Sequence, residues 1–139
     1  MIVETPGIGQ GDAGIVPFVD TSMYVMTPEF GAASQLEKID MLDFADVVVI
    51  NKFDRKGSDD ALRDVAKQVQ RNQEAFDRMP EDMPVFGSIA SRFNDDGVTA
   101  TYQHLLGVLL LCQHMITSDR LGDLSQITCS IRWYDCGFF

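Results

Sequence analysis

A polar tetrapeptide, Asn51-Lys52-Phe53-Asp54, directly follows an apolar run that ends at Ile50. Ligands bind at the carboxyl ends of strands in open parallel sheets, so a binding site is expected at this position. The Asp54 carboxylate can accept hydrogen bonds from the N1 and N2 donors of guanine, whereas adenine would leave it unpaired. Asn51 can bridge guanine N7 and neighbouring loops, and the stem of Lys52 can cover the base. The tetrapeptide predicts guanine recognition; a polar loop without a ligand is the alternative.

A second segment, Glu4 to Asp12, also follows an apolar run and contains glycines at positions 7, 9 and 11. Glu4 can hold a magnesium-bound water, and the Gly7 amide can approach a γ-phosphate because no Cβ intervenes. The conformation of such a loop would change with the state of the bound nucleotide. Gln10 is a candidate catalytic residue that positions an attacking water. The alternative is a flexible strand-to-helix connection.

A third and weaker candidate is the segment Ser88-Ile89-Ala90, which follows a further apolar run. Its backbone amides could reach guanine O6. Small residues before a loop are common, so this interpretation depends on the two segments above. The interval between Glu4 and Asn51 has room for one strand and one helix. This arrangement returns the chain to the same edge of the sheet.

The elements that must position these residues follow from alternating short apolar runs and longer amphipathic stretches between residues 1 and about 111. This pattern predicts an α/β fold with a parallel sheet flanked by helices. The expected strands are residues 1–3, 23–26, 46–50 and 84–88. The expected helices are residues 31–42, 58–76 and 97–110.

Apolar residues at helical spacing define the buried faces of these helices. The first helix places Leu36, Ile39 and Leu42 on one face. The second is expected to bury Leu62, Val65, Ala66, Val69 and Phe76. The third is expected to bury Val98, Tyr102, Leu105, Leu106 and Leu109, with Asn94 or Asp95 as its N-terminal cap.

The composition excludes several classes of protein. A chain of 139 residues is near the size of one domain, and its net charge of −10 disfavours nucleic acids and anionic membrane surfaces as partners. The longest apolar run, residues 105–112, is far shorter than the ~20 residues that span a bilayer. No secretory signal is recognisable. Three cysteines, all at or beyond Cys112, indicate a reducing, cytoplasmic compartment.

Three stretches carry a resemblance to a known family: Glu4 to Asp12, Thr27 to Asp40 and Ala45 to Asp54. Residues 1 to about 111 resemble the G domain of the fused isobutyryl-CoA mutases and, more distantly, the metallochaperone GTPases that serve methylmalonyl-CoA mutase. The middle stretch is the most diagnostic, because the other two occur in many GTPases.

The resemblance implies a P-loop GTPase domain between a cobalamin-binding domain and a mutase barrel, which would be its partners. GTP and magnesium would gate the loading and protection of adenosylcobalamin, a cofactor of the parent protein that this segment does not bind. By this match Glu4 is the magnesium-side carboxylate and Gly7 the γ-phosphate sensor. The base readers are Asn51, Lys52 and Asp54.

The chain also departs from the family. A P-loop requires Gly, four residues, Gly, Lys and then Ser or Thr, and none of the four lysines follows a glycine. In the family this loop and its strand precede Glu4, and the strand lies between those of Glu4 and residues 23–26. We therefore expect a fragment, inactive alone, with exposed strand edges at the centre of its sheet.

The expected organisation is a partial GTPase domain over residues 1–111 and an atypical tail over residues 112–139, which shows no clear hydrophobic period. One alternative function is a noncatalytic interaction fragment of the mutase. Another is a related metal-insertion GTPase, such as those serving hydrogenase or urease. A metal-insertion GTPase is expected to have a Cys/His metal site near the loop that changes with the nucleotide state. Residues 1–54 contain neither Cys nor His.

Overall fold

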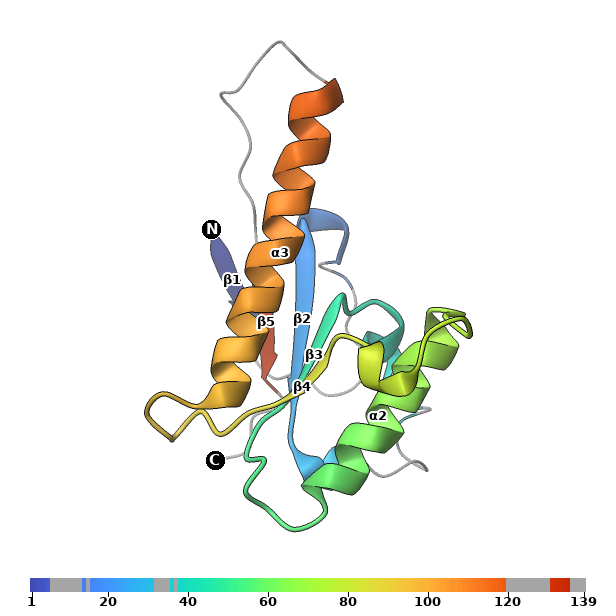
Figure 1. The fold of residues 1–139 in the computed structure, drawn as a ribbon, viewed down its shortest axis with the longest axis vertical. Coiled ribbons are helices and arrows are strands. Elements are labelled where there is room, and N and C mark those ends of the chain that lie inside the picture. The colour runs from blue at the N-terminus through green and yellow to red at the C-terminus, as the bar shows by residue number, and fades with distance from the viewer. Residues whose placement is uncertain (6–13, 15, 32–35, 37, 120–130, 136–139) are drawn as a thin grey trace.

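The computed structural model describes residues 1–5, 14, 16–31, 36, 38–119 and 131–135. Its centre is a parallel five-stranded sheet of order β1-β5-β2-β3-β4 (Figure 1). The strands are β1 (Ile2–Thr5), β2 (Thr21–Met26), β3 (Val47–Ile50), β4 (Val85–Gly87) and β5 (Ile131–Asp135). The predicted parallel α/β architecture is confirmed, with the four predicted strands shifted by only one or two residues at their ends.

Two helices cover the sheet, α2 (Ser58–Asn72) and α3 (Asp96–Asp119). Alternate residues of a strand point to opposite faces, which divides the core into two clusters. Tyr24 and Val48 face the cluster that contains Val65 of α2, whereas Val25 and Val49 face the one that contains Leu105 of α3. The two helices therefore pack on opposite faces of β2 and β3. Short 3-10 helices connect the elements: η1 (Val16–Phe18), η2 (Pro28–Phe30), η3 (Asp40–Asp43) and η4 (Pro80–Asp82).

The helix predicted for residues 31–42 does not reach its expected end. Ile39 has φ −99° and ψ 88°, outside the helical region, and Asp40–Asp43 form the separate 3-10 helix η3. The burial of Leu36, Ile39 and Leu42 was nevertheless predicted correctly. Residues 32–35 and 37 lie outside the described residues.

Helix α2 begins as predicted at Ser58 but ends at Asn72, four residues early. The positive φ of Glu74 (52°) is incompatible with a continuing helix. Phe76, predicted to lie on the buried face, is therefore outside the helix and 71% exposed. Val65, Ala66 and Val69 are buried as expected.

Helix α3 begins one residue before its predicted start and runs past the predicted end, across residue 111. Leu105 is buried, but Val98, Tyr102 and Leu106 are exposed, contrary to prediction. A cylindrical helix buries only the strip that touches the sheet, and no other helix of the described part flanks α3 on that face. In the described part of the chain, no helix has the length and apolarity needed to cross a membrane.

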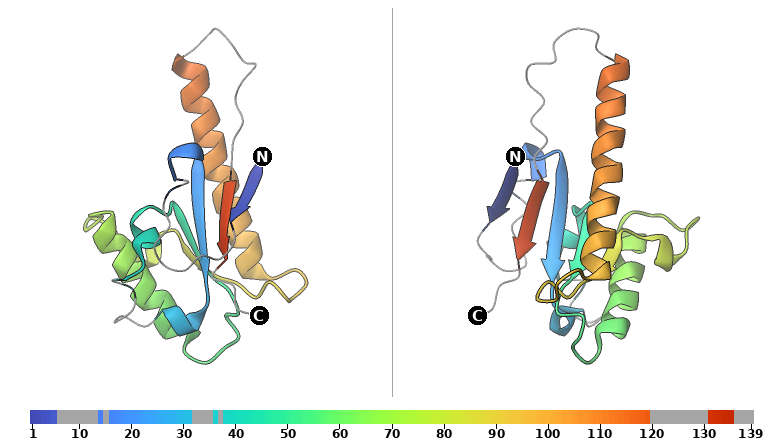
Figure 2. Two further views of the ribbon diagram at one scale, coloured as in Figure 1. Left: turned by 180° about the vertical axis from the view of Figure 1, so that it is seen from behind. Right: turned by 60° about the vertical axis from the view of Figure 1, so that its left-hand side comes forward.

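Strand β5 overturns the expectation of unpaired strand edges at the centre of the sheet. It lies between β1 and β2 and pairs in parallel with both (Figure 2). Glu4 is in register with Trp133, which is in turn in register with Met23. A gap at this position would leave backbone N–H and C=O groups of both neighbours unpaired, and β5 supplies their partners. The C-terminal part of the chain thus links β1 to the rest of the sheet.

Candidate functional site

Two of the three predicted site segments meet where β3 and β4 end. The Ser88 amide donates to the Ile50 carbonyl oxygen at 2.8 Å, and the Phe53 amide donates to the Ser88 carbonyl oxygen at 3.0 Å. The loop after β3 is thereby bonded to the loop after β4. This is the edge at which open parallel sheets bind ligands.

Asn51 connects three strand ends. Its amide donates to the Met26 carbonyl oxygen at the end of β2 (2.8 Å), and its side-chain Oδ1 accepts from the Ala90 amide (3.1 Å). Because Oδ1 is engaged within the protein, the side-chain nitrogen Nδ2 is the group left to donate to a ligand. The Ala90 bond joins the loops after β3 and β4, and the predicted contact of Asn51 with guanine N7 stays a prediction.

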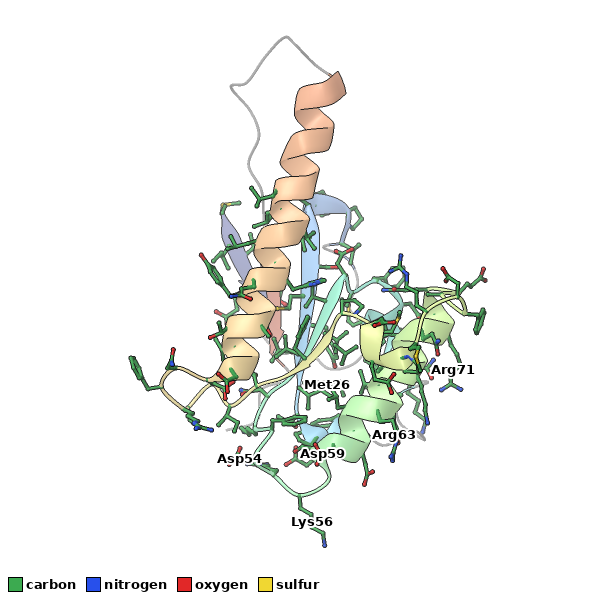
Figure 3. All side chains as sticks on the ribbon, viewed as in Figure 1. Met26, Asp54, Lys56, Asp59, Arg63 and Arg71 are labelled. Atoms are coloured by element: carbon green, nitrogen blue, oxygen red, sulfur yellow. The ribbon has the colours of Figure 1, made fainter. Side chains whose placement is uncertain are left out.

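Lys52 and Phe53 give the loop its shape. Lys52 is half-buried and has a positive φ of 57°, a conformation that non-glycine residues adopt at an energetic cost. The ring of Phe53 lies so close to Gly87 that any Cβ there would overlap it. Asp54, the next residue, is exposed on the loop between β3 and α2 (Figure 3), so its carboxylate is accessible to a ligand.

An ion pair between Arg55 and Glu29, which the sequence analysis did not predict, anchors the same loop. A hydrogen bond from the Thr27 side chain, the Glu29 backbone amide and the Arg55 guanidinium together lower the pKa of Glu29 to about 2. The pair connects η2, within the diagnostic stretch Thr27 to Asp40, to the loop after β3. The only sequence signal was that an acidic and a basic residue each follow a strand end.

A cavity of about 260 Å³ lies between the sheet and α3, beside these loops. Val25 and Val49 of the sheet face Val98 and Leu105 of α3 across it. Its polar lining residues are Asn51, Ser88 and Thr101, and its remaining walls are Ala90 and Tyr102. The cavity is therefore mainly apolar, with the candidate base-recognition loops at one end.

The segment Ser88-Ile89-Ala90 is placed where predicted, but its three amides already have acceptors. Ser88 donates to the Ile50 carbonyl, Ile89 to Asp95 Oδ2 at 3.1 Å, and Ala90 to Asn51 Oδ1. A guanine O6 at this loop would have to share or replace one of these bonds.

Glu4, the first residue of the predicted segment Glu4 to Asp12, lies on β1, apart from these two loops. Glu4 is exposed on β1, in register through Trp133 and Met23 with Val47. Three strand spacings, about 14 Å, separate its strand from β3, although both strands end at the same edge. Gly7 and Gln10 lie outside the described residues. Within the described ranges, no group of three His, Cys, Asp or Glu side chains is arranged to hold a metal ion.

The family model "Methylmalonyl Co-A mutase-associated GTPase MeaB" matches residues 1–102. The chain belongs to the MeaB family. The match confirms the predicted resemblance and the P-loop NTPase-like α/β fold class. The structure thus places the MeaB match on all of β1 to β4 and on the first turns of α3.

Relatives of this MeaB-family chain include fused isobutyryl-CoA mutases. That of Paraburkholderia xenovorans is 76% identical over 109 residues, 78% of this chain and 9% of the relative. That of Nocardia farcinica is 73% identical over 109 residues, 78% of this chain and 10% of the relative. A putative GTPase of Pyrococcus horikoshii is 29% identical over 91 residues, 66% of this chain and 29% of the relative. The chain spans about a tenth of the length of the fused relatives.

Proposed function

We propose that this chain supplies the guanine-recognition half of a MeaB-type GTPase. The observation that carries the proposal is the bonded pair of loops after β3 and β4, where the Asn51 side chain joins the loops and the Asp54 carboxylate stays accessible. Family membership supports guanine as the base.

Each residue of the loop has a distinct role in this proposal. Asp54 accepts hydrogen bonds from guanine N1 and N2, which selects guanine over adenine. Asn51 donates from Nδ2 to N7, an acceptor that both purines share. The half-buried stem of Lys52 covers the base plane. Ser88, Ile89 and Ala90 form the wall beside the base, and contact with O6 requires one of their amide bonds to be shared.

The phosphate side of the proposed site rests on the segment after β1. Glu4 has an exposed carboxylate, and oxygen ligands of this kind suit Mg²⁺, so Glu4 would hold a magnesium-bound water. Gly7 would sense the γ-phosphate and Gln10 would orient the attacking water. Bound magnesium would supply charge neutralisation to the phosphates. These three assignments depend on the family resemblance.

The proposal extends to the longer protein through the relatives. Their name supports mutase domains as partners of this segment. The family resemblance further implies a neighbouring cobalamin-binding domain and a cytoplasmic GTPase that gates the loading and protection of adenosylcobalamin. Residues 1–111 would be the GTPase-derived part and residues 112–139 an atypical C-terminal segment. The family match over residues 1–102 supports this division.

A second candidate function is a noncatalytic interaction module. Two observations favour it: the 139 residues contain no Gly-x4-Gly-Lys-Ser/Thr motif, and β5 lies beside β1 in the sheet. Such a module would contact the mutase domains without turning over nucleotide. A metal-insertion GTPase is not favoured by any specific observation.

Titration of the full chain with guanosine and adenosine nucleotides, followed by NMR, tests the proposal. We expect shifts in the loops 51–54 and 88–90 with GTP, and at least tenfold weaker binding of ATP. Asp54→Ala should abolish the preference, whereas Asp59→Ala, an exposed carboxylate at the start of α2 (Figure 3), should leave it unchanged. Equal responses to GTP and ATP would contradict guanine recognition and favour the interaction module.

A further inference from the structure

Asp95 lies between the candidate base-recognition loops and helix α3. It is 8% exposed, and it immediately precedes the first residue of the helix. Its carboxylate Oδ2 accepts from the Val98 amide at 3.0 Å, which is the bond of an N-terminal cap, as the sequence predicted for Asn94 or Asp95.

The same oxygen makes a second bond that capping does not require. Oδ2 also accepts from the Ile89 amide at 3.1 Å, six residues earlier in the chain and inside the candidate site segment 88–90. Hydrogen bonds from the backbone amide of Ile89 and, to a smaller extent, from that of Val98 hold the pKa of Asp95 below its ordinary value. A charged acceptor thus ties the loop after β4 to the helix that follows it.

The bonded chain continues from Ile89 to Asn51. Ala90, the next residue, donates its amide to Asn51 Oδ1 at 3.1 Å. The amide plane of Asn51 is fixed by this bond, and that plane sets the direction of Nδ2, the donor proposed for the base. Asp95 is therefore connected to the Asn51 side chain through the backbone amides of two consecutive residues, Ile89 and Ala90.

The packing around this chain leaves little freedom. A Cβ on Gly97 would overlap the Gly87 carbonyl oxygen and come within 3.0 Å of Asp95 Oδ2. Gly87 itself lies against the Phe53 ring. The first turn of α3, the end of β4 and the loop after β3 are thus in direct contact.

We propose that Asp95 is a positioning residue for the nucleotide base, acting through Ile89 and Ala90 on the orientation of the Asn51 side chain. This inference rests on the proposed guanine-recognition function for its consequence in binding. Its structural part, the coupling of Asp95 to the Ala90–Asn51 bond, can be measured without a nucleotide.

Asp95→Ser separates positioning from capping. Serine is a good N-cap and retains an acceptor for the helix, but its shorter side chain cannot also reach Ile89. Asp95→Asn, which keeps an oxygen at the same distance, is the rescue variant. Asp96→Ser, a change of an exposed carboxylate at the next position, is the matched control.

Amide hydrogen exchange of the full-length variants tests the coupling. We expect Asp95→Ser to accelerate exchange at Ala90, whose amide donates to Asn51 rather than to Asp95, by about tenfold, with a similar change at Ile89. Asp95→Asn should retain most of the protection and Asp96→Ser all of it. Unchanged exchange at Ala90 in Asp95→Ser would overturn the proposal.

NMR titration with guanosine 5′-monophosphate tests the consequence for binding. We expect Asp95→Ser and Asn51→Ala to weaken binding by a similar factor of about three to ten, and the double variant to be no weaker than Asn51→Ala alone. Additive losses would show that Asp95 does not act through Asn51 and would refute the proposal. If the unaltered chain binds no purine nucleotide, the proposed function fails, and the exchange at Ala90 alone decides the positioning role.

Discussion

The Asn51 side chain and the Ala90 backbone, 39 residues apart in sequence, are joined by a 3.1 Å hydrogen bond that holds the loops after β3 and β4 together. The bond uses the acceptor of Asn51 and leaves its donor for the base. One side chain thus has a structural and a recognition role, and substitution can separate the two.

Asn51→Asp should retain the Ala90 bond and lose only the donor. We expect binding of both purine nucleotides to weaken, because N7 is common to them, while unfolding free energy stays within about 0.5 kcal/mol of the unaltered chain. Asn51→Ala should cost an additional ~0.5–1.5 kcal/mol. Urea denaturation and NMR titration measure the two effects, and equal stability of the two variants would contradict this assignment.

The 139-residue chain should bind GTP no more tightly than roughly the millimolar range, about 4 kcal/mol short of a micromolar site. The base motif mainly provides discrimination, whereas a P-loop holds the triphosphate, and no P-loop motif occurs in these residues. The net charge of −10 also opposes a polyanion. Micromolar binding measured by calorimetry, or phosphate release that Asp54→Ala abolishes, would contradict this prediction. Either result would show that contacts outside a P-loop are sufficient to hold the triphosphate.

Gly31→Ala should destabilise the chain by ~1–3 kcal/mol, since the added Cβ would overlap the Ala61 side chain of α2. The φ of Gly31 is −80°, so backbone strain does not contribute. Gly107→Ala is the control: its Cβ would meet nothing within 4 Å, and we expect a neutral change or a gain of up to ~1 kcal/mol in α3. Thermal unfolding measures the stability of both variants, and an equal change in the two would contradict the predicted overlap with Ala61.

Ser22 and Asp46 fix the register of β2 against β3. Asp46 Oδ2 accepts from the Ser22 amide at 2.7 Å, and the buried Ser22 hydroxyl contacts both this oxygen (2.9 Å) and the Phe44 carbonyl (2.7 Å). Asp46→Ala should therefore cost ~1–3 kcal/mol by leaving the Ser22 amide without its carboxylate. The exposed Asp43→Ala should cost less than ~0.5 kcal/mol. Chemical denaturation distinguishes them.

The Glu29 carboxylate, which accepts hydrogen bonds from the Thr27 side chain, its own backbone amide and Arg55, should make stability depend on pH in acid. Because folding lowers the pKa of Glu29 to about 2, its stabilising contribution is complete above its ordinary pKa of 4.5 and is lost as the pH falls toward 2. Both side chains are about half exposed, so the contribution is at most ~1 kcal/mol and falls with salt. The stability difference between the unaltered chain and Glu29→Gln should shrink between pH 4.5 and 2; a constant difference would exclude this role.

Deletion of residues 131–139 should release β1 and expose an edge of β2, because β5 pairs with both. We expect loss of the cooperative unfolding transition and concentration-dependent association. Deletion of residues 136–139 alone, which retains β5, is the matched control. A monomeric, cooperative transition in the longer deletion would show that β5 is dispensable for the sheet.

Local patterns were enough to predict much of this molecule. The β-branched run Val47–Ile50 identified a buried strand, the spacing of Val65, Ala66 and Val69 identified the buried face of α2, and the strand-then-polar pattern located the loops at 51–54 and 88–90. Each of these signals depends on residues within a few positions of one another. Periodicity reports local burial directly, which explains its success.

Other features depend on contacts between distant residues and could not be predicted from local patterns. Strand β5 has no periodicity that marks it as central, and its place is set by the unpaired backbone groups of β1 and β2. The exposure of Tyr102 depends on what lies beside α3, and the second bond of Asp95 depends on where the chain returns after β4. Residue types and their position after a strand were enough to identify candidate base-recognition residues. Backbone hydrogen bonds between distant segments set how these residues are held, and such pairing leaves no local pattern in the sequence.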